Sequence, residues 1–321
     1  MKNKDSVAIL MSTYNGEQFL DEQIKSIINQ TYQDWHLYIR DDGSSDNTVE
    51  ILRKYSKKDN RITFINENKI KNVGIVASFM SLLDSVNAYY YMFSDQDDVW
   101  KMDKIAITLE KMKSETNKDN IPVCVHTDLQ VVDSKLKGEQ SMKKGYVWSS
   151  FYHLMFGNCV TGCTMMINQS VKDKIKFESQ NKNLIPLHDW WIALIASAFG
   201  KVVFINEKTI YYRQHEKNVI GSNKKNDVFH IIGRLCDQKT DENNMINVIR
   251  MAYEFDRLYK TNKSISLKKR ELIHSYAKVF EKSSPFFNLK TVIYNPPRRM
   301  KIKGNFFFAY LMIKDFKKIR N

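Results

Sequence analysis

The fold is decided by residues 7–46, which read VAILMSTYNGEQFLDEQIKSIINQTYQDWHLYIRDDGSSD. This stretch opens with a short, continuous apolar run, which is typical of a parallel strand covered on both faces. Apolar residues then recur at spacings of three and four between Phe19 and Tyr32, and this pattern predicts an amphipathic helix. A second apolar run follows and ends at two aspartates and a glycine turn. The succession of strand, helix and strand predicts an α/β fold with a mostly parallel sheet.

The same alternation continues through the next fifty residues. Residues 61–67 and 88–95 predict two further strands, and residues 73–86 predict the helix between them. A serine or aspartate at 44–46 is expected to cap the helix that follows the second strand. Ligands of such sheets bind beyond the carboxyl ends of the strands. The residues that follow each strand are therefore the candidates for a binding site.

Carboxylates follow two of the predicted strands. Asp41 and Asp42 come after the second strand, and Asp95, Asp97 and Asp98 come after the fourth, in the segment SDQDDVW. Such groups repel one another unless a cation or a hydrogen-bonding ligand offsets the repulsion. Mg²⁺ or Mn²⁺ meets this need, because both ions prefer oxygen ligands and leave positions open for phosphate. The alternative is an acidic turn whose last aspartate caps a helix a few residues later.

No other means of holding phosphate stands out in the sequence. There is no GxGxxG motif, and residues 157–164 (GNCVTGCT) have the glycine spacing of a P-loop but place Cys163 where the lysine is needed. The four cysteines form no CxxC pair, so we expect reduced, mostly buried thiols. A metal held by carboxylates is therefore the predicted way to neutralise a diphosphate.

Three segments carry a resemblance to a known family. Residues 7–48 resemble the N-terminus of glycosyltransferase family 2, the inverting enzymes with a GT-A nucleotide-sugar fold. SDQDDVW resembles the Asp-x-Asp metal motif of that family, and LHDWW at 187–191 resembles its catalytic-base segment. Together with YYRQHEKNVIG at 211–221, SDQDDVW is similar to the rhamnosyltransferase-like subgroup. The resemblance covers about residues 5–222.

The resemblance implies a division of the chain and a reaction. Residues 1–222 would form a GT-A catalytic domain, with a nucleotide-binding half of about 1–100 and an acceptor half of about 101–222. Such an enzyme would move a sugar, rhamnose by the subgroup, from a UDP- or dTDP-sugar. The acceptor would be a hydroxyl of a growing cell-surface polysaccharide or of a lipid-linked glycan.

The resemblance also assigns the nucleotide-binding residues, which are Ser12, Tyr14, Asp41, Asp42 and Asp95. A carboxylate at Asp41 can accept the imide N–H of uracil or thymine, and the ring of Tyr14 can stack on the base. The alternative for Asp41 and Asp42 is purely local, because aspartate before glycine often caps its own turn.

The resemblance also implies a metal site. Asp97 would bind Mn²⁺ or Mg²⁺ directly, Asp95 would complete the Asp-x-Asp pair, and Asp98 would be a further ligand or would support the ligands. Asp189 matches the base of the family, although aspartate is also a good helix N-cap. The implied reaction is a single displacement in which Asp189 takes the proton of the acceptor hydroxyl and the anomeric configuration inverts.

Four further residues are expected to contact the substrate or its diphosphate. They are His188, Trp190, Arg213 and His215. The last two are expected on a mobile loop near the end of the catalytic domain. The alternatives are an ion pair of Arg213 with a surface acid and a structural role for His188.

The remainder of the chain, residues 223–321, predicts a helical and basic region. The net charge is +14, and residues 291–321 hold eight Lys or Arg against one Asp beside the apolar run NFFFAYLMI. This pattern suits a helix on an anionic membrane surface, with docking on the catalytic domain or homo-oligomer formation as alternatives. No run resembles a signal peptide or a bilayer-spanning helix, so we expect a protein that stays in the cytoplasm. Together with the basic, apolar tail, this predicts a peripheral position at the inner face of the plasma membrane.

Two other classes of protein fit parts of the pattern. A metal-dependent nucleotidyltransferase or phosphoesterase also gathers carboxylates at strand ends, but it has no need of a separate base segment at HDWW. A nucleic-acid-binding protein fits the positive charge, but the strand ends expected to form the cleft are acidic. We therefore expect no nucleic-acid partner.

Overall fold

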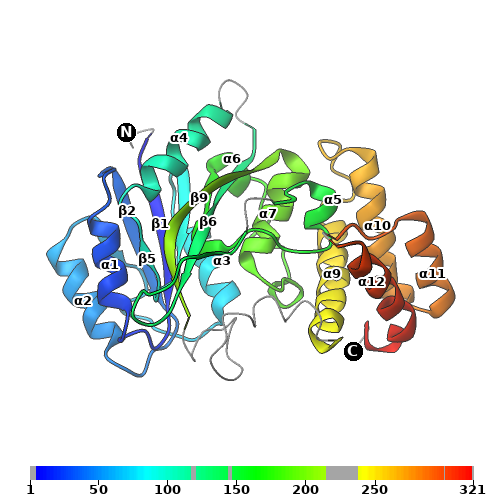
Figure 1. Cartoon of the computed structure of the whole chain (residues 1–321), viewed down its shortest axis with the longest axis horizontal. Coiled ribbons are helices and arrows are strands. Elements are labelled where there is room, and N and C mark those ends of the chain that lie inside the picture. Colours follow the sequence, from blue (N-terminus) through cyan, green and yellow to red (C-terminus); the bar gives the residue numbers. More distant parts are fainter. Residues whose placement is uncertain (1–4, 117–120, 144–146, 215–237, 300, 320–321) are drawn as a thin grey trace.

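The computed structural model describes residues 5–116, 121–143, 147–214, 238–299 and 301–319 (Figure 1). Within these residues nine strands form one sheet, in the order β3-β2-β1-β4-β8-β6-β9-β5, with β7 paired to β6. Helices cover both faces of the sheet, and four more helices lie at the end of the molecule away from β2 (Figure 1).

The first half of the sheet is parallel, as the alternating pattern predicts. Its strands are β1 (Val7–Thr13), β2 (Trp35–Asp41), β3 (Ile62–Phe64) and β4 (Tyr90–Ser94). The helices between them are α1 (Leu20–Ile28), α2 (Thr48–Lys58) and α3 (Ile75–Ser85). Each falls where the sequence pattern places it. The N-cap of α2 is Asn47, one residue after the expected positions 44–46, and its side chain makes no capping hydrogen bond. Asp46, just before it, accepts a hydrogen bond from the backbone N–H of Thr48 at 3.1 Å.

The second half of the sheet is mixed. Its strands are β5 (Val99–Trp100), β6 (Val123–Val132), β7 (Gln140–Ser141), β8 (Met165–Asn168) and β9 (Lys201–Arg213). β8 runs antiparallel to both β4 and β6, and β5 runs antiparallel to β9, while β6 and β9 are parallel. The parallel arrangement therefore extends over β1–β4 and gives way to mixed pairing where β8 inserts beside β4.

Short helices connect these strands. They are α4 (Lys104–Thr116), α5 (Phe151–Leu154), η1 (Gly162–Thr164), α6 (Gln169–Lys172), η2 (Lys182–Leu184) and α7 (His188–Phe199). Residues 157–168 form a loop that leads through η1 into β8, and α7 begins at His188.

The C-terminal region is helical, as predicted. It contains α9 (Gln238–Tyr259), α10 (Leu267–Lys282), α11 (Pro285–Tyr294), α12 (Ile302–Lys314) and η4 (Phe316–Ile319). Residues 223–237 of the predicted helical region lie outside the described residues. In the described part of the chain, every helix is too short or too polar to cross a bilayer.

Two apolar clusters sandwich the sheet. Successive residues of β1 alternate between them, with Ala8 and Leu10 facing one cluster and Val7, Ile9 and Met11 facing the other. The second cluster packs α1, α2 and α4 against the sheet, and the first packs α3 and α7.

The first cluster also contains the C-terminal helices. Phe255 of α9 packs edge-on against Trp191 of α7, with ring centroids 5.8 Å apart, and Phe308 of α12 lies in the same cluster. The C-terminal helices thus share one hydrophobic core with the helices α3 and α7 that cover the sheet.

This shared core yields a stability prediction. Phe255→Ala leaves a cavity between α9 and α7, and we expect it to cost about 3–5 kcal/mol of unfolding free energy, measured by urea denaturation. Phe286→Ala, at an 80% exposed ring on α11, is the matched control and should change the free energy little. Near-UV circular dichroism should report a single transition. Two separate unfolding transitions would show independent cores if Phe255→Ala shifted only the transition of the C-terminal helices.

Candidate active site

The ends of β1, β2 and β4 meet at one edge of the sheet. Thr13 at the end of β1 pairs in register with Asp41 at the end of β2, and Met11 pairs with Ser94 at the end of β4. The residues that follow these strands therefore lie close together, as the order of the strands predicts.

Asp41 is fully buried and holds its own turn together. Its carboxylate accepts hydrogen bonds from the Thr13 hydroxyl at 2.9 Å, the Gly43 N–H at 3.0 Å, the Ser44 N–H at 2.8 Å and the Ser44 hydroxyl at 2.5 Å. These four bonds use the acceptor capacity of a carboxylate. Stabilisation of this local structure thus accounts for these contacts of the Asp41 carboxylate. Contact with the imide of a base remains a prediction, and it requires the Ser44 hydroxyl to turn away from the carboxylate.

Asp42 anchors the loop before α3. It accepts from the Arg40 guanidinium at 2.7 Å, from the Val73 N–H at 2.8 Å and from the Gly74 N–H at 2.9 Å. Gly74 has a φ of 81°, a left-handed conformation that favours glycine. Asp42 therefore fixes the entry into α3 at the edge where the strand ends meet.

Tyr14 has an exposed side chain and a fixed backbone. Its N–H donates to Gln96 Oε1 at 2.8 Å, and its carbonyl accepts from Gln96 Nε2 at 2.9 Å. A Cβ at Gly16 would lie 2.3 Å from Gln96 Oε1, so only glycine leaves room for this amide. Nearby, the Ser12 hydroxyl lies 2.6 Å from that of Ser78.

Sequence reasoning missed the role of Gln96. The residue is the middle position of Asp-x-Asp, where the family pattern specifies nothing. Its amide ties the loop after β1 to the acidic loop after β4, two segments eighty residues apart in the sequence. Only the pairing of these distant loops reveals the contact.

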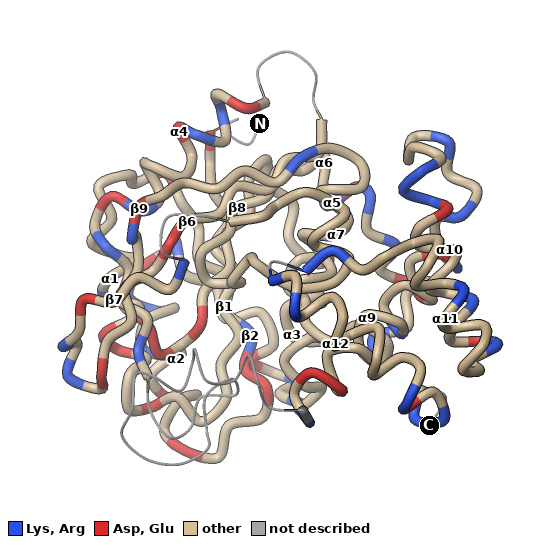
Figure 2. Tube along the Cα trace, turned by 45° about the vertical axis from the view of Figure 1, so that its right-hand side comes forward, with Lys and Arg blue, Asp and Glu red and all other residues tan. Residues whose placement is uncertain are grey.

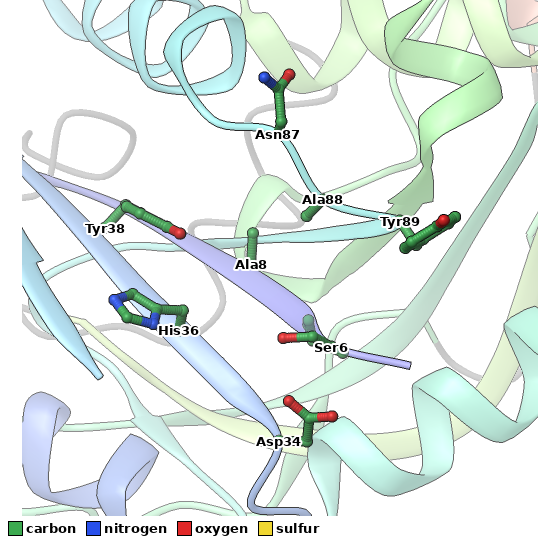
Figure 3. A pocket seen from close by; sticks show the side chains of 9 residues that line it. Ser6, Ala8, Asp34, His36, Tyr38, Asn87, Ala88 and Tyr89 are labelled. Atoms are coloured by element: carbon green, nitrogen blue, oxygen red, sulfur yellow. The ribbon is translucent and has the colours of Figure 1, made fainter. Parts of the chain in front are cut away.

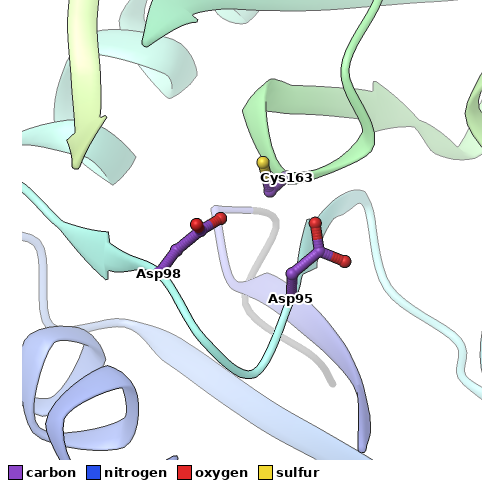
Figure 4. Close-up of side chains that lie close together, drawn as sticks. All are labelled: Asp95, Asp98 and Cys163. Atoms are coloured by element: carbon purple, nitrogen blue, oxygen red, sulfur yellow. The ribbon is translucent and has the colours of Figure 1, made fainter. Parts of the chain in front are cut away.

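The acidic loop forms a compact cluster with a thiol. One ligand atom each of Asp95, Asp98 and Cys163 lie within 4.8 Å of one another (Figure 4). Burial, reinforced by Asp97 and Asp189, raises the pKa of Asp95 to about 7. Burial, reinforced by Asp97 and Asp95, raises the pKa of Asp98 well above its usual range.

The cluster fits a hard divalent cation. Asp98 is buried, and its Oδ2 atom has no hydrogen-bond partner among the described residues. A cation would supply the missing partner and would offset the repulsion among the carboxylates. Burial raises the pKa of the Cys163 thiol well above its usual value, so this group remains protonated and the oxygen atoms are the ligands on offer.

The structure does not bear out the alternative of an acidic helix cap. β5 follows Asp98 directly, and α4 begins only at Lys104. Lys104 is fully buried, with its amine 4.7 Å from the centre of the Trp100 ring, and burial lowers its pKa to about 8. Sequence reasoning missed this lysine, which is close enough to Asp98 and Cys163 to influence both electrostatically.

Arg213 differs from the expectation of a mobile loop. It ends β9, is 2% exposed, and donates from Nε to the Asp97 carbonyl at 2.9 Å. Its other guanidinium nitrogens bind the Ser134 carbonyl at 2.5 Å and the Glu22 carboxylate. Arg213 is therefore a rigid support for the acidic loop. His215 lies outside the described residues.

Asp189 sits in the first turn of α7, whose N-cap is Leu187. Its carboxylate accepts from Asn158 Nδ2 at 3.0 Å, from the Gly162 N–H at 2.9 Å and from the Trp190 N–H at 2.6 Å. Burial raises its pKa to about 6, while these donors oppose the rise. The residue is thus buried and hydrogen-bonded at the start of the helix, but it is not the cap.

The turn η1 links this carboxylate to the acidic cluster. Gly162 donates its N–H to Asp189, and the next residue, Cys163, contacts Asp95 and Asp98. Asp189 also contributes to the raised pKa of Asp95, so the two carboxylates are near neighbours.

His188 and Trp190 face the core, contrary to the expected substrate contacts. The His188 ring stacks on Phe79 with centroids 4.2 Å apart, and burial lowers its pKa to about 3. The Trp190 indole N–H donates to the Leu154 carbonyl at 2.6 Å. Both rings are buried and pack α7 against its surroundings.

A separate hollow lies at the opposite edge of the sheet (Figure 3). It is lined by Ser6, Val7, Ala8, Asp34, His36, Tyr38, Asn87, Ala88 and Tyr89. Ser6, Asp34 and Tyr89 precede β1, β2 and β4, so the hollow opens at the amino ends of these strands. It is therefore distinct from the acidic cluster at their carboxyl ends.

Comparison with known proteins identifies the family. The model of "Glycosyl transferase family 2" matches residues 8–173, slightly more than half of the chain. The chain belongs to glycosyltransferase family 2. The "dTDP-rhamnosyl transferase RfbG" of Shigella flexneri is 32% identical to this glycosyltransferase over 66% of the chain and 74% of its own length. The "Putative teichuronic acid biosynthesis glycosyltransferase TuaG" of Bacillus subtilis is 27% identical over 69% of the chain and 83% of its own length.

Solved structures share the fold of this glycosyltransferase. S. aureus TarS 1-349 in complex with UDP-GlcNAc has a TM-score of 0.54 at 15% identity, covering 98% of this chain and 90% of its own. The mannosyltransferase PcManGT from Pyrobaculum calidifontis, in complex with GDP-Man and Mn²⁺, has a TM-score of 0.53 at 10% identity, covering 98% and 85%. The predicted GT-A-like α/β fold with appended C-terminal helices is therefore confirmed.

The amide clamp of Gln96 predicts a kinetic effect. Gln96→Ala removes two hydrogen bonds of about 1 kcal/mol each from the Tyr14 backbone, and the KM for the donor should rise roughly ten-fold. The melting temperature should fall by no more than a few degrees, because the lost bonds are few and lie at the surface. Gln33→Ala, at the opposite edge of the sheet, is the matched control. A fall in melting temperature with an unchanged KM would assign Gln96 to folding instead.

Proposed function

We propose that this enzyme transfers a sugar from a UDP- or dTDP-sugar to a hydroxyl of a cell-surface glycan by a single displacement that inverts the anomeric carbon. The proposal rests on one observation: the turn η1 connects Asp189 with the cluster of Asp95 and Asp98. Gly162 binds Asp189, while Cys163 lies against Asp95 and Asp98.

The donor side of the proposal uses the edge where β1, β2 and β4 end. Tyr14 offers an exposed aromatic ring on a backbone clamped by Gln96, which suits stacking on a pyrimidine. Asp41 would accept the imide N–H of the base once Ser44 releases it. Uracil and thymine present the same imide edge, so both donors are retained, and rhamnose is supported by the similarity to RfbG.

Asp95, Asp97 and Asp98 would hold Mn²⁺ or Mg²⁺. The ion would supply electrostatic stabilisation of the charge that develops on the departing nucleoside diphosphate. Arg213 holds the Asp97 carbonyl and the Asp98 carboxylate in place through its side-chain and backbone N–H groups. The loop therefore keeps its shape with little reorganisation when the donor binds.

Asp189 is the proposed base. Its three hydrogen-bond donors fix the direction of the carboxylate, and its pKa of about 6 leaves it ionised at neutral pH. A carboxylate with a raised pKa accepts a proton more readily than an ordinary aspartate. Asp189 would take the proton of the acceptor hydroxyl as that oxygen attacks the face opposite the diphosphate.

The proposed acceptor is a growing surface polysaccharide or a lipid-linked glycan. Its support is the similarity to RfbG and TuaG and the basic, apolar C-terminal region. A peripheral position at the inner face of the plasma membrane belongs to the same proposal. No feature of the described residues favours a nucleotidyltransferase, a phosphoesterase or a nucleic-acid-binding role over glycosyl transfer.

Donor turnover tests the reaction. The enzyme is incubated with UDP-, dTDP- and GDP-sugars and Mn²⁺ or Mg²⁺, and release of nucleoside diphosphate is measured. We expect turnover of one pyrimidine donor, dependent on metal, and a loss of at least about a hundred-fold in Asp97→Asn and in Asp189→Asn. Glu207→Gln, an exposed isosteric change on β9, is the control. Unchanged turnover in Asp97→Asn would exclude the acidic cluster from the reaction.

The raised pKa of Asp189 predicts the pH dependence. The base must be ionised, so kcat/KM should fall about ten-fold per unit as the pH drops below about 6. The Asn158 side chain donates to this carboxylate and lowers its pKa, so Asn158→Ala should move the limb to higher pH. The variant distinguishes titration of Asp189 from titration of Asp95, because the Asn158 side chain binds Asp189. A limb that stays in place in Asn158→Ala contradicts the assignment of the base.

A further inference from the structure

Helix α11 exposes an apolar face, while its inward side mixes polar residues with Phe287 and Val292, which pack on the core. The buried positions include Asn288 and Thr291, whose side chains bind the carbonyls of Met312 at 2.6 Å and Phe287 at 3.0 Å. The exposed face consists of Phe286 at 80%, Leu289 at 44%, Ile293 at 65% and Tyr294 at 73% exposure. These four recur at spacings of three, four and one, which places them on one side of the helix.

Helix α12 adds a second exposed apolar row. Ile302, Phe306 and Tyr310 recur every four residues and are 75%, 74% and 52% exposed. The core face of the same helix is separate and consists of Phe308, Leu311 and Met312. The two helices pack against each other at the end of the molecule farthest from α2 (Figure 1). We call the exposed apolar residues of α11 and α12 the apolar rows.

Positive charges surround the apolar rows. Residues 285–319 contain eight Lys or Arg and a single acid, Asp315. Two of the cations are paired with acids of α9, Arg299 with Asp241 and Lys318 with Glu242. The other cations are Lys290, Arg298, Lys301, Lys303, Lys314 and Lys317, all exposed. Blue segments in this part of the chain mark them in Figure 2.

The partner of such a surface must be both apolar and anionic. A second copy of this chain would bring an equal positive charge against the first, and the repulsion opposes that arrangement. Nucleic acid would satisfy the cations but would leave the aromatic and aliphatic side chains in water. A bilayer with anionic headgroups satisfies both, because apolar side chains enter the boundary with the acyl chains while cations meet the headgroups.

We propose that α11 and α12 lie on an anionic membrane surface, with Phe286, Ile293, Ile302 and Phe306 inserted among the lipid headgroups. This inference rests on the peripheral membrane position in the proposed function. It adds the class of lipid that is bound and the residues that bind it. It brings α11 into the contact, although the sequence pattern pointed only to the tail.

Vesicle binding of the full chain tests the apolar rows. Without any sugar donor, the enzyme is sedimented with vesicles of phosphatidylglycerol and phosphatidylcholine mixed, or of phosphatidylcholine alone. We expect binding at least about ten-fold tighter to the anionic vesicles, weakened by salt. The variant Phe286→Gln/Ile293→Gln/Ile302→Gln/Phe306→Gln should lose at least about ten-fold in affinity. Met102→Gln, at an exposed methionine on the far side of the sheet, should bind as wild type.

The cations are tested by a matched pair of variants. Lys290→Gln/Lys301→Gln/Lys303→Gln should weaken binding to anionic vesicles about ten-fold or more. Lys54→Gln/Lys57→Gln/Lys58→Gln makes the same change in net charge on α2 and should leave binding within about two-fold. Equal losses in both triple variants would reduce the effect to net charge and overturn the proposal.

Other outcomes also decide the matter. Absence of vesicle binding by the wild type overturns the proposal, as does binding that the apolar variant retains. Analytical ultracentrifugation tests whether a second copy of the chain binds the apolar rows instead. An oligomer that dissociates in the apolar variant would identify that copy as the partner and would overturn the proposal. Because no donor is present, a failure here leaves the transferase reaction untouched, and a failure of donor turnover leaves vesicle binding intact.

Discussion

Mutual repulsion among Asp95, Asp97 and Asp98 is the constraint around which the site is built. Two of these carboxylates are held near a protonated thiol in a buried cluster, where ionisation costs more than in water. The chain holds the loop from outside. Arg213 binds the backbone of the loop, and the Gln96 amide ties it to the end of β1. These contacts fix the loop mainly through its backbone and the Gln96 side chain, and the Arg213 N–H uses only one oxygen of Asp98, so the Oδ2 atom of Asp98 is left for a cation.

Much of this arrangement could be predicted from the sequence, because it depends on local patterns. Continuous apolar runs mark β1, β2 and β4, and the parallel order of these strands brings their following residues to one edge. The reversal at β8 could not be predicted in this way, since the direction of a buried strand leaves no mark in its composition. Arg213 was misplaced for a related reason: β9 extends to residue 213, and only the pairing with β6 reveals its length.

Helix α11 shows a different limit of sequence reasoning. An amphipathic pattern identifies two faces, but it does not say which face meets the protein. The usual assumption puts the apolar face inside, whereas here Asn288 and Thr291 lie inside beside Phe287 and Val292 and donate hydrogen bonds to backbone carbonyls. For Asp189 the sequence does identify the opposing influences, burial and the helix N-terminus. The balance between them follows from three donors whose positions depend on the tertiary fold.

The core shared by α7 and the C-terminal helices bears on how such enzymes diversify. Trp191, two residues from Asp189, packs on Phe255 of α9, so the surface beneath the proposed base is completed by the C-terminal region. Recombination between relatives therefore cannot exchange the C-terminal helices as a cassette without matching α7 to them.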